Sequence, residues 1–227
     1  MKTKLIIFDF DGTLSKPNKL PNSWTRIWAK IDRKEDDDRL YGQYIRGEID
    51  YNEWAIEVLK IYREAGVNRK LLEEIAKDTL LLDDSDEVLK SLYEKGIKTI
   101  ILSGGIKNII NFVLGKSEKY IYKIEAQEIL FDSDGVVNGI TKLNHFIEDK
   151  SQYVSMIIDE LNLDPSEVVF FGNSENDETV YKTGVKTICI NPQGANYKDS
   201  AIWNKVIKNC KSLKELLPFI EENDKNI

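Results

Sequence analysis

The sequence contains few of the residues that form disulfides or bind metals through sulfur. Its 227 residues include only two cysteines, Cys189 and Cys210, and a single histidine, His145. This count indicates neither a disulfide framework nor a cysteine-based metal site. Cys189 lies in an apolar stretch, which predicts a buried and unreactive thiol. His145 precedes Lys150 in a segment without clear periodicity, so we expect a structural or surface role for it rather than a catalytic one.

Long apolar runs and excess positive charge are also missing. No stretch is long enough to span a bilayer, and the apolar run that follows residues 1–4 is too short for the core of a signal peptide. A net charge of −7 and a pI near 5.0 argue against a surface for nucleic acid or anionic membrane. We therefore expect a cytoplasmic protein that binds neither, while the oligomeric state stays open.

Short apolar runs alternate with segments of helical periodicity along most of the chain. The runs lie at residues 5–8, 98–102, 168–171 and 186–190. Helical patterns between them lie at residues 86–95 and 153–161. This alternation predicts an α/β fold with a doubly wound parallel sheet. Residues 128–140 are rich in Asp and Gly at their centre, which predicts a β-hairpin.

Residues 15–81 interrupt the alternation. They contain amphipathic helix patterns, such as the i, i+3, i+4, i+7 series of Trp24, Ile27, Trp28 and Ile31. We expect a small helical bundle inserted after the first strand, and a main domain made of residues 1–14 and 82–227. A module inserted there would lie over the strand end as a lid.

Two further features of this insert have simple structural interpretations. The charged residues 32–39 are typical of a solvated loop or a helix end. Aromatic residues gather in the insert, and the simplest interpretation is that they build the core of the bundle rather than a substrate box. The aromatic residues concerned are Trp24, Trp28, Tyr41, Tyr44, Trp54 and Tyr62.

Two carboxylates follow the first apolar run directly, because residues 9–13 are Asp-Phe-Asp-Gly-Thr. Ligands bind at the carboxyl ends of strands in open α/β sheets, and buried acids need a positive partner. The segment therefore indicates a metal ion and carboxylates held for chemistry. We expect Asp9 and Asp11 to point the same way from an extended backbone. Taken alone, a solvated turn that happens to hold two acids explains the pattern equally well.

Three later segments carry similar chemistry at predicted strand or helix ends. Residues 103–105, Ser-Gly-Gly, offer a hydroxyl and backbone N–H groups at the start of a helix over 106–114, which suits an anion. Lys150 begins a helix, where its charge opposes the dipole and requires a phosphate or carboxylate partner. Residues 172–177, Gly-Asn-Ser-Glu-Asn-Asp, offer oxygen ligands for a hard cation such as Mg²⁺. An ordinary glycine-rich turn and a surface lysine are the alternatives for the first two.

In this order the segments resemble the motifs of the haloacid dehalogenase (HAD) superfamily. Residues 9–13 resemble its first motif, residues 103–104 its second, Lys150 its third and residues 172–177 its fourth. The resemblance covers essentially the whole chain, and the insert matches the first cap type of the family. The hairpin and the spacing from Lys150 to Asn173 are most similar to the phosphoserine phosphatase branch. The resemblance implies a Rossmann-like HAD core and Mg²⁺-dependent hydrolysis of a small phosphomonoester.

The resemblance also implies a role for each matching residue. Asp9 would attack phosphorus and form an aspartyl phosphate, and Asp11 would act as general acid and base. Mg²⁺ would be held by Asp9, by the backbone carbonyl of Asp11 and by Asn173. Because dehalogenases of the superfamily attack carbon without this second acid, Asp11 favours phosphoryl transfer.

The remaining implied roles concern the phosphoryl group and the water. Ser103, the Gly104 N–H and Lys150 would bind the phosphoryl oxygens, and Asp177 would orient metal-bound water.

Two features depart from the pattern of the branch. Asn173 stands where the fourth motif usually has Asp, so we expect weaker Mg²⁺ binding than an Asp would give. No Glu follows the first motif to bind the amine of phosphoserine; Lys16 and Lys19 there would suit an anionic group, although solvated lysines are the simpler interpretation. The sequence leaves the substrate unnamed. A catalytically weak module that binds a phosphometabolite or a protein, and a phosphotransferase using the same intermediate, stay open as alternatives.

Overall fold

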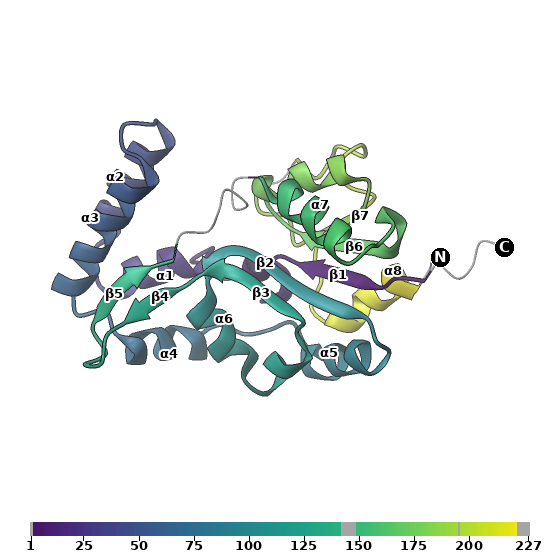
Figure 1. The fold of residues 1–227 in the computed structure, drawn as a ribbon, viewed down its shortest axis with the longest axis horizontal. Coiled ribbons are helices and arrows are strands. Elements are labelled where there is room, and N and C mark those ends of the chain that lie inside the picture. The colour runs from purple at the N-terminus through teal and green to yellow at the C-terminus, as the bar shows by residue number, and fades with distance from the viewer. Residues whose placement is uncertain (1, 142–148, 195, 222–227) are drawn as a thin grey trace.

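The fold is built around one parallel sheet (Figure 1). The structure is a computed structural model that describes residues 2–141, 149–194 and 196–221, so His145 lies outside the described residues. Six strands lie in the order β3-β2-β1-β6-β7-β8, and each neighbouring pair is parallel. Their bounds are Leu5–Phe8 (β1), Lys98–Ile106 (β2), Lys123–Gln127 (β3), Val168–Gly172 (β6), Lys186–Ile190 (β7) and Lys205–Ile207 (β8). The predicted doubly wound sheet is confirmed.

Both faces of the sheet are covered, because successive strand residues point to opposite sides. Ile6 and Phe8 belong to one apolar cluster, and Leu5 and Ile7 to another, all four fully buried. Burial on both faces explains why the strands are unbroken apolar runs. The first face packs on α5 (Ser85–Glu94), α6 (Lys107–Leu114) and α8 (Leu217–Glu221), and the second on α7 (Lys150–Glu160). Within the described ranges, no helix is long and apolar enough to cross a membrane.

The two cysteines lie inside this domain as free thiols. Cys189 in β7 and Cys210 are both buried. Burial raises the pKa of each thiol to about 12, so neither forms a thiolate near neutral pH. This agrees with the unreactive thiol predicted at Cys189.

The inserted segment forms four helices at one end of the molecule, on the left of Figure 1. They are α1 (Ser23–Lys30), α2 (Lys34–Ile45), α3 (Tyr51–Glu64) and α4 (Arg69–Lys77). Trp28 and Tyr62 are fully buried among them, with ring centroids 4.8 Å apart. The charged residues 32–39 lie mostly in the first turns of α2, so the predicted helix end is confirmed.

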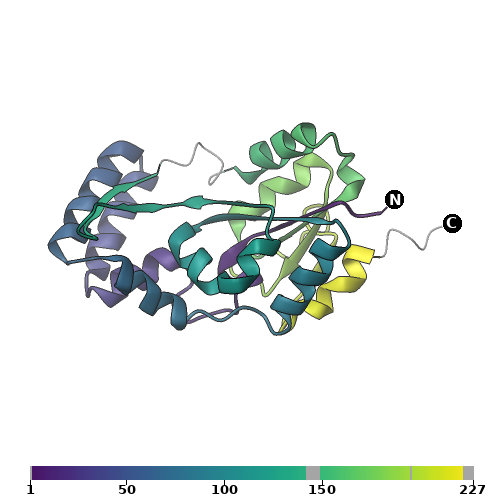
Figure 2. The same cartoon turned by 60° about the horizontal axis from the view of Figure 1, so that its bottom comes forward.

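A β-hairpin from the main domain shares the core of these helices. Its strands β4 (Ile129–Phe131) and β5 (Val137–Ile140) are antiparallel, as predicted. Ile129 and Val137 are buried in the same cluster as Trp28 and Tyr62, and Figure 2 shows the hairpin lying along the helices. The hairpin therefore adds a β layer to the helical insert.

The two chain segments that enter and leave the insert run side by side. Ser15 and Leu81 form an antiparallel bridge. The backbone N–H of Lys16 donates to the Leu80 carbonyl at 2.7 Å, and that of Leu82 donates to the Leu14 carbonyl at 3.0 Å. We propose on this basis that residues 15–81 form a cap domain and that residues 1–14 with 82–227 form the main domain.

Candidate active site

A buried lysine links the ends of two strands. Lys150, the first residue of α7, is fully buried, and its Nζ lies 2.8 Å from Asp9 Oδ1 and 2.5 Å from Asp177 Oδ1. Asp9 follows β1, and its backbone N–H donates to the Phe171 carbonyl of β6 at 2.8 Å. The carboxylate partner predicted for Lys150 is thus present, in two copies.

The three charges do not balance. Burial alone would lower the pKa of the Lys150 ammonium, but the charges of Asp177 and Asp9 raise it above its usual value. Burial raises the pKa of the Asp9 carboxyl, while the Lys150 charge works in the opposite direction. One ammonium can offset only one of the two carboxylates, so the ionised form of Asp9 beside Asp177 would favour a further cation.

The backbone reverses direction at Gly12, which adopts φ +78°. The turn over residues Phe10–Leu14 is closed by the Ser15 N–H, which donates to the Phe10 carbonyl at 2.9 Å. A Cβ at Gly12 would lie 2.4 Å from Asn173 Nδ2, so only glycine allows both the turn and the close approach of Asn173. Asp9 (φ −66°, ψ 163°) and Asp11 (φ −68°, ψ 113°) themselves keep extended dihedral angles, as expected. Both side chains line one cavity.

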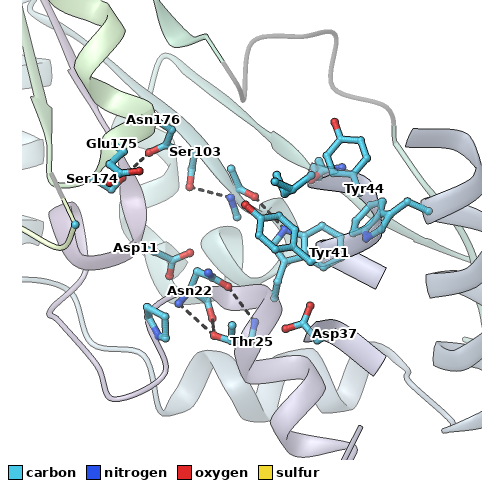
Figure 3. A pocket seen from close by; sticks show the side chains of 18 of the residues that line it. Asp11, Asn22, Thr25, Asp37, Tyr41, Tyr44, Ser103, Ser174, Glu175 and Asn176 are labelled. Carbon is cyan, nitrogen blue, oxygen red and sulfur yellow. Dashed lines mark hydrogen bonds between the residues drawn. The ribbon is translucent and has the colours of Figure 1, made fainter. Parts of the chain in front are cut away.

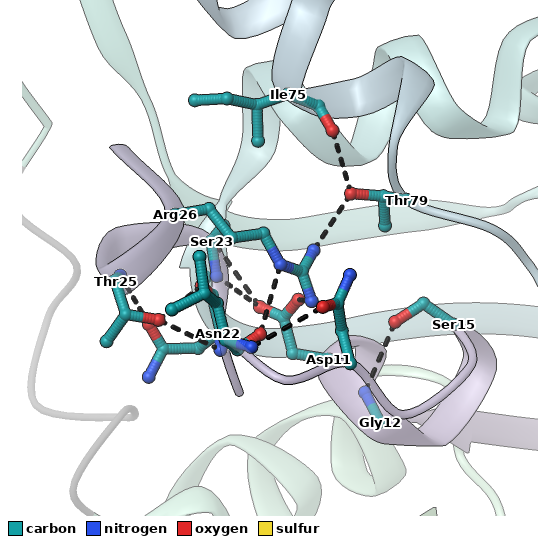
Figure 4. Close-up of polar contacts among 12 residues, drawn as sticks. Asp11, Gly12, Ser15, Asn22, Ser23, Thr25, Arg26, Ile75 and Thr79 are labelled. Carbon is teal, nitrogen blue, oxygen red and sulfur yellow. Dashed lines mark hydrogen bonds and ion pairs between the residues drawn. The ribbon is translucent and has the colours of Figure 1, made fainter. Parts of the chain in front are cut away.

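Asp11 is held by the first turn of α1 (Figure 4). Its Oδ2 accepts hydrogen bonds from the Ser23 backbone N–H at 3.1 Å and from the Ser23 hydroxyl at 3.2 Å. Arg26 Nη2 lies 3.3 Å from Asp11 Oδ1, and both residues are buried. Burial raises the pKa of the Asp11 carboxyl, which outweighs the lowering effect of Arg26 and Ser23. Residues of the insert therefore position the Asp11 carboxyl. Its raised pKa favours the protonated form.

Arg26 is itself held by two further hydrogen bonds. Its Nη1 donates to the Thr79 hydroxyl at 2.9 Å, and its Nε donates to the Leu20 carbonyl at 3.2 Å. The Thr79 hydroxyl donates in turn to the Ile75 carbonyl of α4. The Arg26 guanidinium group of α1 therefore links the Asp11 carboxyl, through Thr79, to the end of α4.

The glycine-rich segment 103–105 continues strand β2 up to Ile106, beyond the predicted end at residue 102. The Gly105 N–H donates to the Ser103 hydroxyl at 3.1 Å, and the Ile106 N–H donates to the Ser23 hydroxyl at 2.8 Å. A Cβ at Gly105 would lie 2.7 Å from Asp11 Oδ2. These two N–H groups are thus occupied inside the protein, contrary to the expectation that the helix start presents them to an anion.

The fourth segment wraps around Asp177, which is fully buried. Asp177 Oδ2 accepts from the backbone N–H groups of Asn173 and Ser174 at 2.9 and 3.0 Å. A Cβ at Gly172 would lie 2.6 Å from Asp177 Cγ, so glycine is required there. Asp177 both shapes this loop and holds Lys150.

One cavity of about 1230 Å³ unites most of these residues (Figure 3). Asp9, Asp11, Ser103, Gly104 and Asn173 line its main-domain end. Lys150 and Asp177 lie behind Asp9, in contact with it or with each other, and outside the lining. The structure thus brings the predicted residues together.

The donor set suits a hard cation held by mixed oxygens. Among the residues with described positions, no three His, Cys, Asp or Glu side chains cluster as a metal site. Asn173 is buried, and its amide nitrogen lacks a hydrogen-bond partner. Because amide nitrogen and oxygen are assigned by their surroundings, turning this amide would present an oxygen beside Gly12, in the cavity that Asp9 also lines. Carboxylate, carbonyl and amide oxygens together fit Mg²⁺.

Several site residues could not be found from the sequence. Ser23, Trp24 and Arg26 belong to a helix whose periodicity indicated core packing, and their partners Asp11 and Gly104 are distant in the chain. The only local signal is the capping box at Asn22, which marks where α1 begins. The two lysines after the first motif lie elsewhere: Lys16 pairs with Asp83 at the surface, Lys19 is exposed, and neither lines the cavity.

Comparison with known proteins gives a family match over most of the chain. The model of a family described as haloacid dehalogenase-like hydrolase matches residues 3–180. Two curated relatives are phosphoserine phosphatases. The one from Archaeoglobus fulgidus is 23% identical over 188 residues, covering 83% of this chain and 52% of that protein. The one from Methanocaldococcus jannaschii is 22% identical over 225 residues, covering 97% and 99%. The chain thus spans about half of the first relative.

Among solved structures, one similar chain is a phosphoserine phosphatase described as a phospho-aspartyl intermediate analogue. It has a TM-score of 0.70 and 17% sequence identity, and the match covers 97% of this chain and all of that one. At this identity the likeness concerns the fold.

The charge arrangement at Lys150 generates a stability prediction. Lys150→Met keeps the aliphatic stem but leaves Asp9 and Asp177 buried together without a cation, so we expect a loss of about 3–5 kcal/mol in unfolding free energy. Lys90→Met is the control, since Lys90 is 55% exposed and pairs only with Glu94; it should change stability by less than about 0.5 kcal/mol. Urea unfolding monitored by circular dichroism measures both. Equal stability of the two variants would contradict this account of the charges.

Proposed function

The chain belongs to the haloacid dehalogenase-like hydrolases, and on that premise we propose that it is a Mg²⁺-dependent phosphatase acting on a small phosphomonoester. The observation that carries the proposal is the pair of buried carboxylates in one cavity, Asp9 beside a lysine and Asp11 beside a hydroxyl and an arginine. Support for a phosphoric monoester hydrolase also comes from the two phosphoserine phosphatase relatives.

In the proposed first step, a carboxylate oxygen of Asp9 attacks phosphorus. The bond from phosphorus to the leaving oxygen breaks, and Asp11 gives its proton to that oxygen. In the second step, Asp11 takes a proton from water, and the water oxygen attacks the phosphorus of the aspartyl phosphate. The bond from phosphorus to the Asp9 oxygen breaks, inorganic phosphate leaves, and Asp9 is again a carboxylate while Asp11 again carries its proton.

Three groups are proposed to bind the phosphoryl oxygens. The Lys150 ammonium has three N–H donors; Asp9 and Asp177 accept two of them, and the third is proposed to serve a phosphoryl oxygen. The Ser103 hydroxyl and the Gly104 backbone N–H complete the set. Fixed donors of this kind stabilise the charge that spreads over the oxygens in the transition state.

The metal would be held by Asp9, the Asp11 carbonyl and Asn173. Bound there, Mg²⁺ would neutralise phosphate charge as a Lewis acid. Its support is that Asp9 and Asp177 share a single ammonium and that the buried amide nitrogen of Asn173 lacks a hydrogen-bond partner. Asp177, which fixes the Asn173 and Ser174 backbone, is proposed to orient metal-bound water.

Ser23 and Arg26 are proposed as positioning residues for Asp11. They hold its carboxyl from the cap, so the general acid is in place only when α1 lies against the main domain. The Ser23 hydroxyl also accepts from the Ile106 N–H at 2.8 Å, which ties α1 to the end of β2. Cap docking and acid positioning are thereby one event.

The direct test of function is hydrolysis of p-nitrophenyl phosphate with Mg²⁺, with EDTA, and with the Asp9→Asn variant. We expect activity with Mg²⁺, its loss with EDTA, and a fall in kcat of about a thousandfold or more in Asp9→Asn, the scale of losing a covalent nucleophile. Asp134→Asn, at an exposed position of the hairpin turn, should keep full activity. Wild-type rates in Asp9→Asn would overturn the proposal.

If Ser23 and Arg26 position Asp11, the loss of kcat in variants of these residues should depend on how strongly the leaving group needs a proton. Arg26→Met should lower kcat about 10–100-fold for glycerol 2-phosphate, whose leaving oxygen needs a proton, and much less for p-nitrophenyl phosphate. Ser23→Ala should shift the two rates in the same way, and Arg26→Lys should recover part of the loss. Arg46→Met, at a residue paired only with exposed Glu48, is the control. An equal loss on both substrates would refute a role through Asp11.

A further inference from the structure

The cap end of the cavity is lined by five aromatic residues, here called the aromatic chamber: Trp24, Tyr41, Tyr44, Tyr51 and Trp54. The Trp54 ring centroid lies 5.3 Å from that of Trp24, 5.6 Å from that of Tyr51 and 6.2 Å from that of Tyr44. The predicted aromatic core of the bundle is confirmed for Trp28 and Tyr62. Trp24 and Trp54 pack against that core and also line the cavity, and Tyr41 and Tyr44 line the cavity.

The aromatic chamber is fixed relative to the reacting end. Trp24 Nε1 donates to the Gly104 carbonyl at 2.9 Å, next to Ser103. The Tyr51 hydroxyl accepts from the Gln127 amide at 2.7 Å and donates to the Thr141 carbonyl at 3.1 Å. A phosphoryl group at Asp9 would thus direct its leaving group toward these rings.

A partly buried carboxylate, Asp37, faces the same space, and the charge of Lys34 on the same helix favours its ionised form. Asp37, Tyr41 and Tyr44 are spaced i, i+4, i+7 on α2, so they share one helix face, and Figure 3 shows them across the cavity from Asp11. The neighbouring Asp36 pairs with Arg33 and Arg39 at 2.5 and 2.9 Å. Among the described residues, no Lys or Arg forms an ion pair with Asp37. Burial and the charge of Asp38 raise the pKa of Asp37 to about 6, while the charge of Lys34 lowers it.

The described lining of the cavity offers no cationic side chain to a carboxylate on the leaving group. No Lys, Arg or His side chain occurs in its lining as far as the chain is described, whereas Asp37, Asp38, Asp50 and Glu175 do. A negative leaving group would enter without a cation to offset its lost hydration. A positive one would gain the negative faces of the rings and the Asp37 charge.

From the rings, the Asp37 carboxylate and the lack of cationic side chains in the described lining of the cavity, we infer that the leaving group is an alcohol that carries an ammonium group and no carboxylate. This inference rests on the proposed function and gives it a substrate class. It also separates this chain from an enzyme that selects phosphoserine, whose leaving group bears a carboxylate.

The test compares matched substrates on the full chain with Mg²⁺. Phosphocholine is compared with 3,3-dimethylbutyl phosphate, a neutral compound of the same shape, and with O-phosphoserine. We expect kcat/KM for phosphocholine to exceed that for each of the other two about tenfold or more, the scale of a desolvated cation–π contact. O-Phosphoethanolamine should also exceed the neutral compound.

Variants locate the effect in the chamber. Asp37→Asn and Tyr41→Leu should bring the ratio of phosphocholine to 3,3-dimethylbutyl phosphate toward one, and Tyr41 is 57% exposed, so its replacement should not disturb folding. Asp36→Asn should keep the wild-type ratio. Hydrolysis of p-nitrophenyl phosphate with a ratio of one or less, or with phosphoserine preferred, overturns this inference alone. No hydrolysis of any of these esters overturns the proposed function itself.

Discussion

The ion pairs of Lys150 with Asp9 and Asp177 are the interaction on which the rest of the site depends. They join the end of β1, the start of α7 and the loop after β6, three segments distant in sequence, at one fully buried nitrogen. Because a buried ammonium requires carboxylate partners, the helix must begin where the two strand ends lie side by side. Because Asp9 and Asp177 share the single Lys150 ammonium, the site would favour a further cation when both carboxyls are ionised.

A second constraint comes from the cap. Asp11 is held by the backbone N–H and hydroxyl of Ser23 and by Arg26, all in the first turn of α1. The two carboxylates of one short motif are thus held by different segments: Asp9 by Lys150 of α7, and Asp11 by Ser23 and Arg26 of α1. In the account proposed here, the position of the general acid Asp11 therefore depends on the cap, whereas the position of the nucleophile Asp9 does not.

Much of the fold and part of the site follow from sequence, for physical reasons. The strands are recognisable because burial on both faces makes them continuous apolar runs, and the motif residues lie at their ends. The tight turn at Gly12 is not recognisable, since its cause is the approach of Asn173 from another strand. The role of Arg26 is not recognisable either, since its partner Asp11 belongs to another segment of the chain. The aromatic residues of the insert are ambiguous, because a helix face that packs on a core and one that lines a cavity have the same periodicity.

The central claim is that Asp9 becomes covalently phosphorylated. Its most direct test is a single turnover of p-nitrophenyl phosphate, quenched in acid within milliseconds, digested and analysed by mass spectrometry. The account predicts a transient phosphoryl group on the peptide that contains residues 5–16, assigned to Asp9 and released by hydroxylamine, with Asp11 unmodified. Phosphate release without any such intermediate, or a phosphoryl group on another residue, would contradict it.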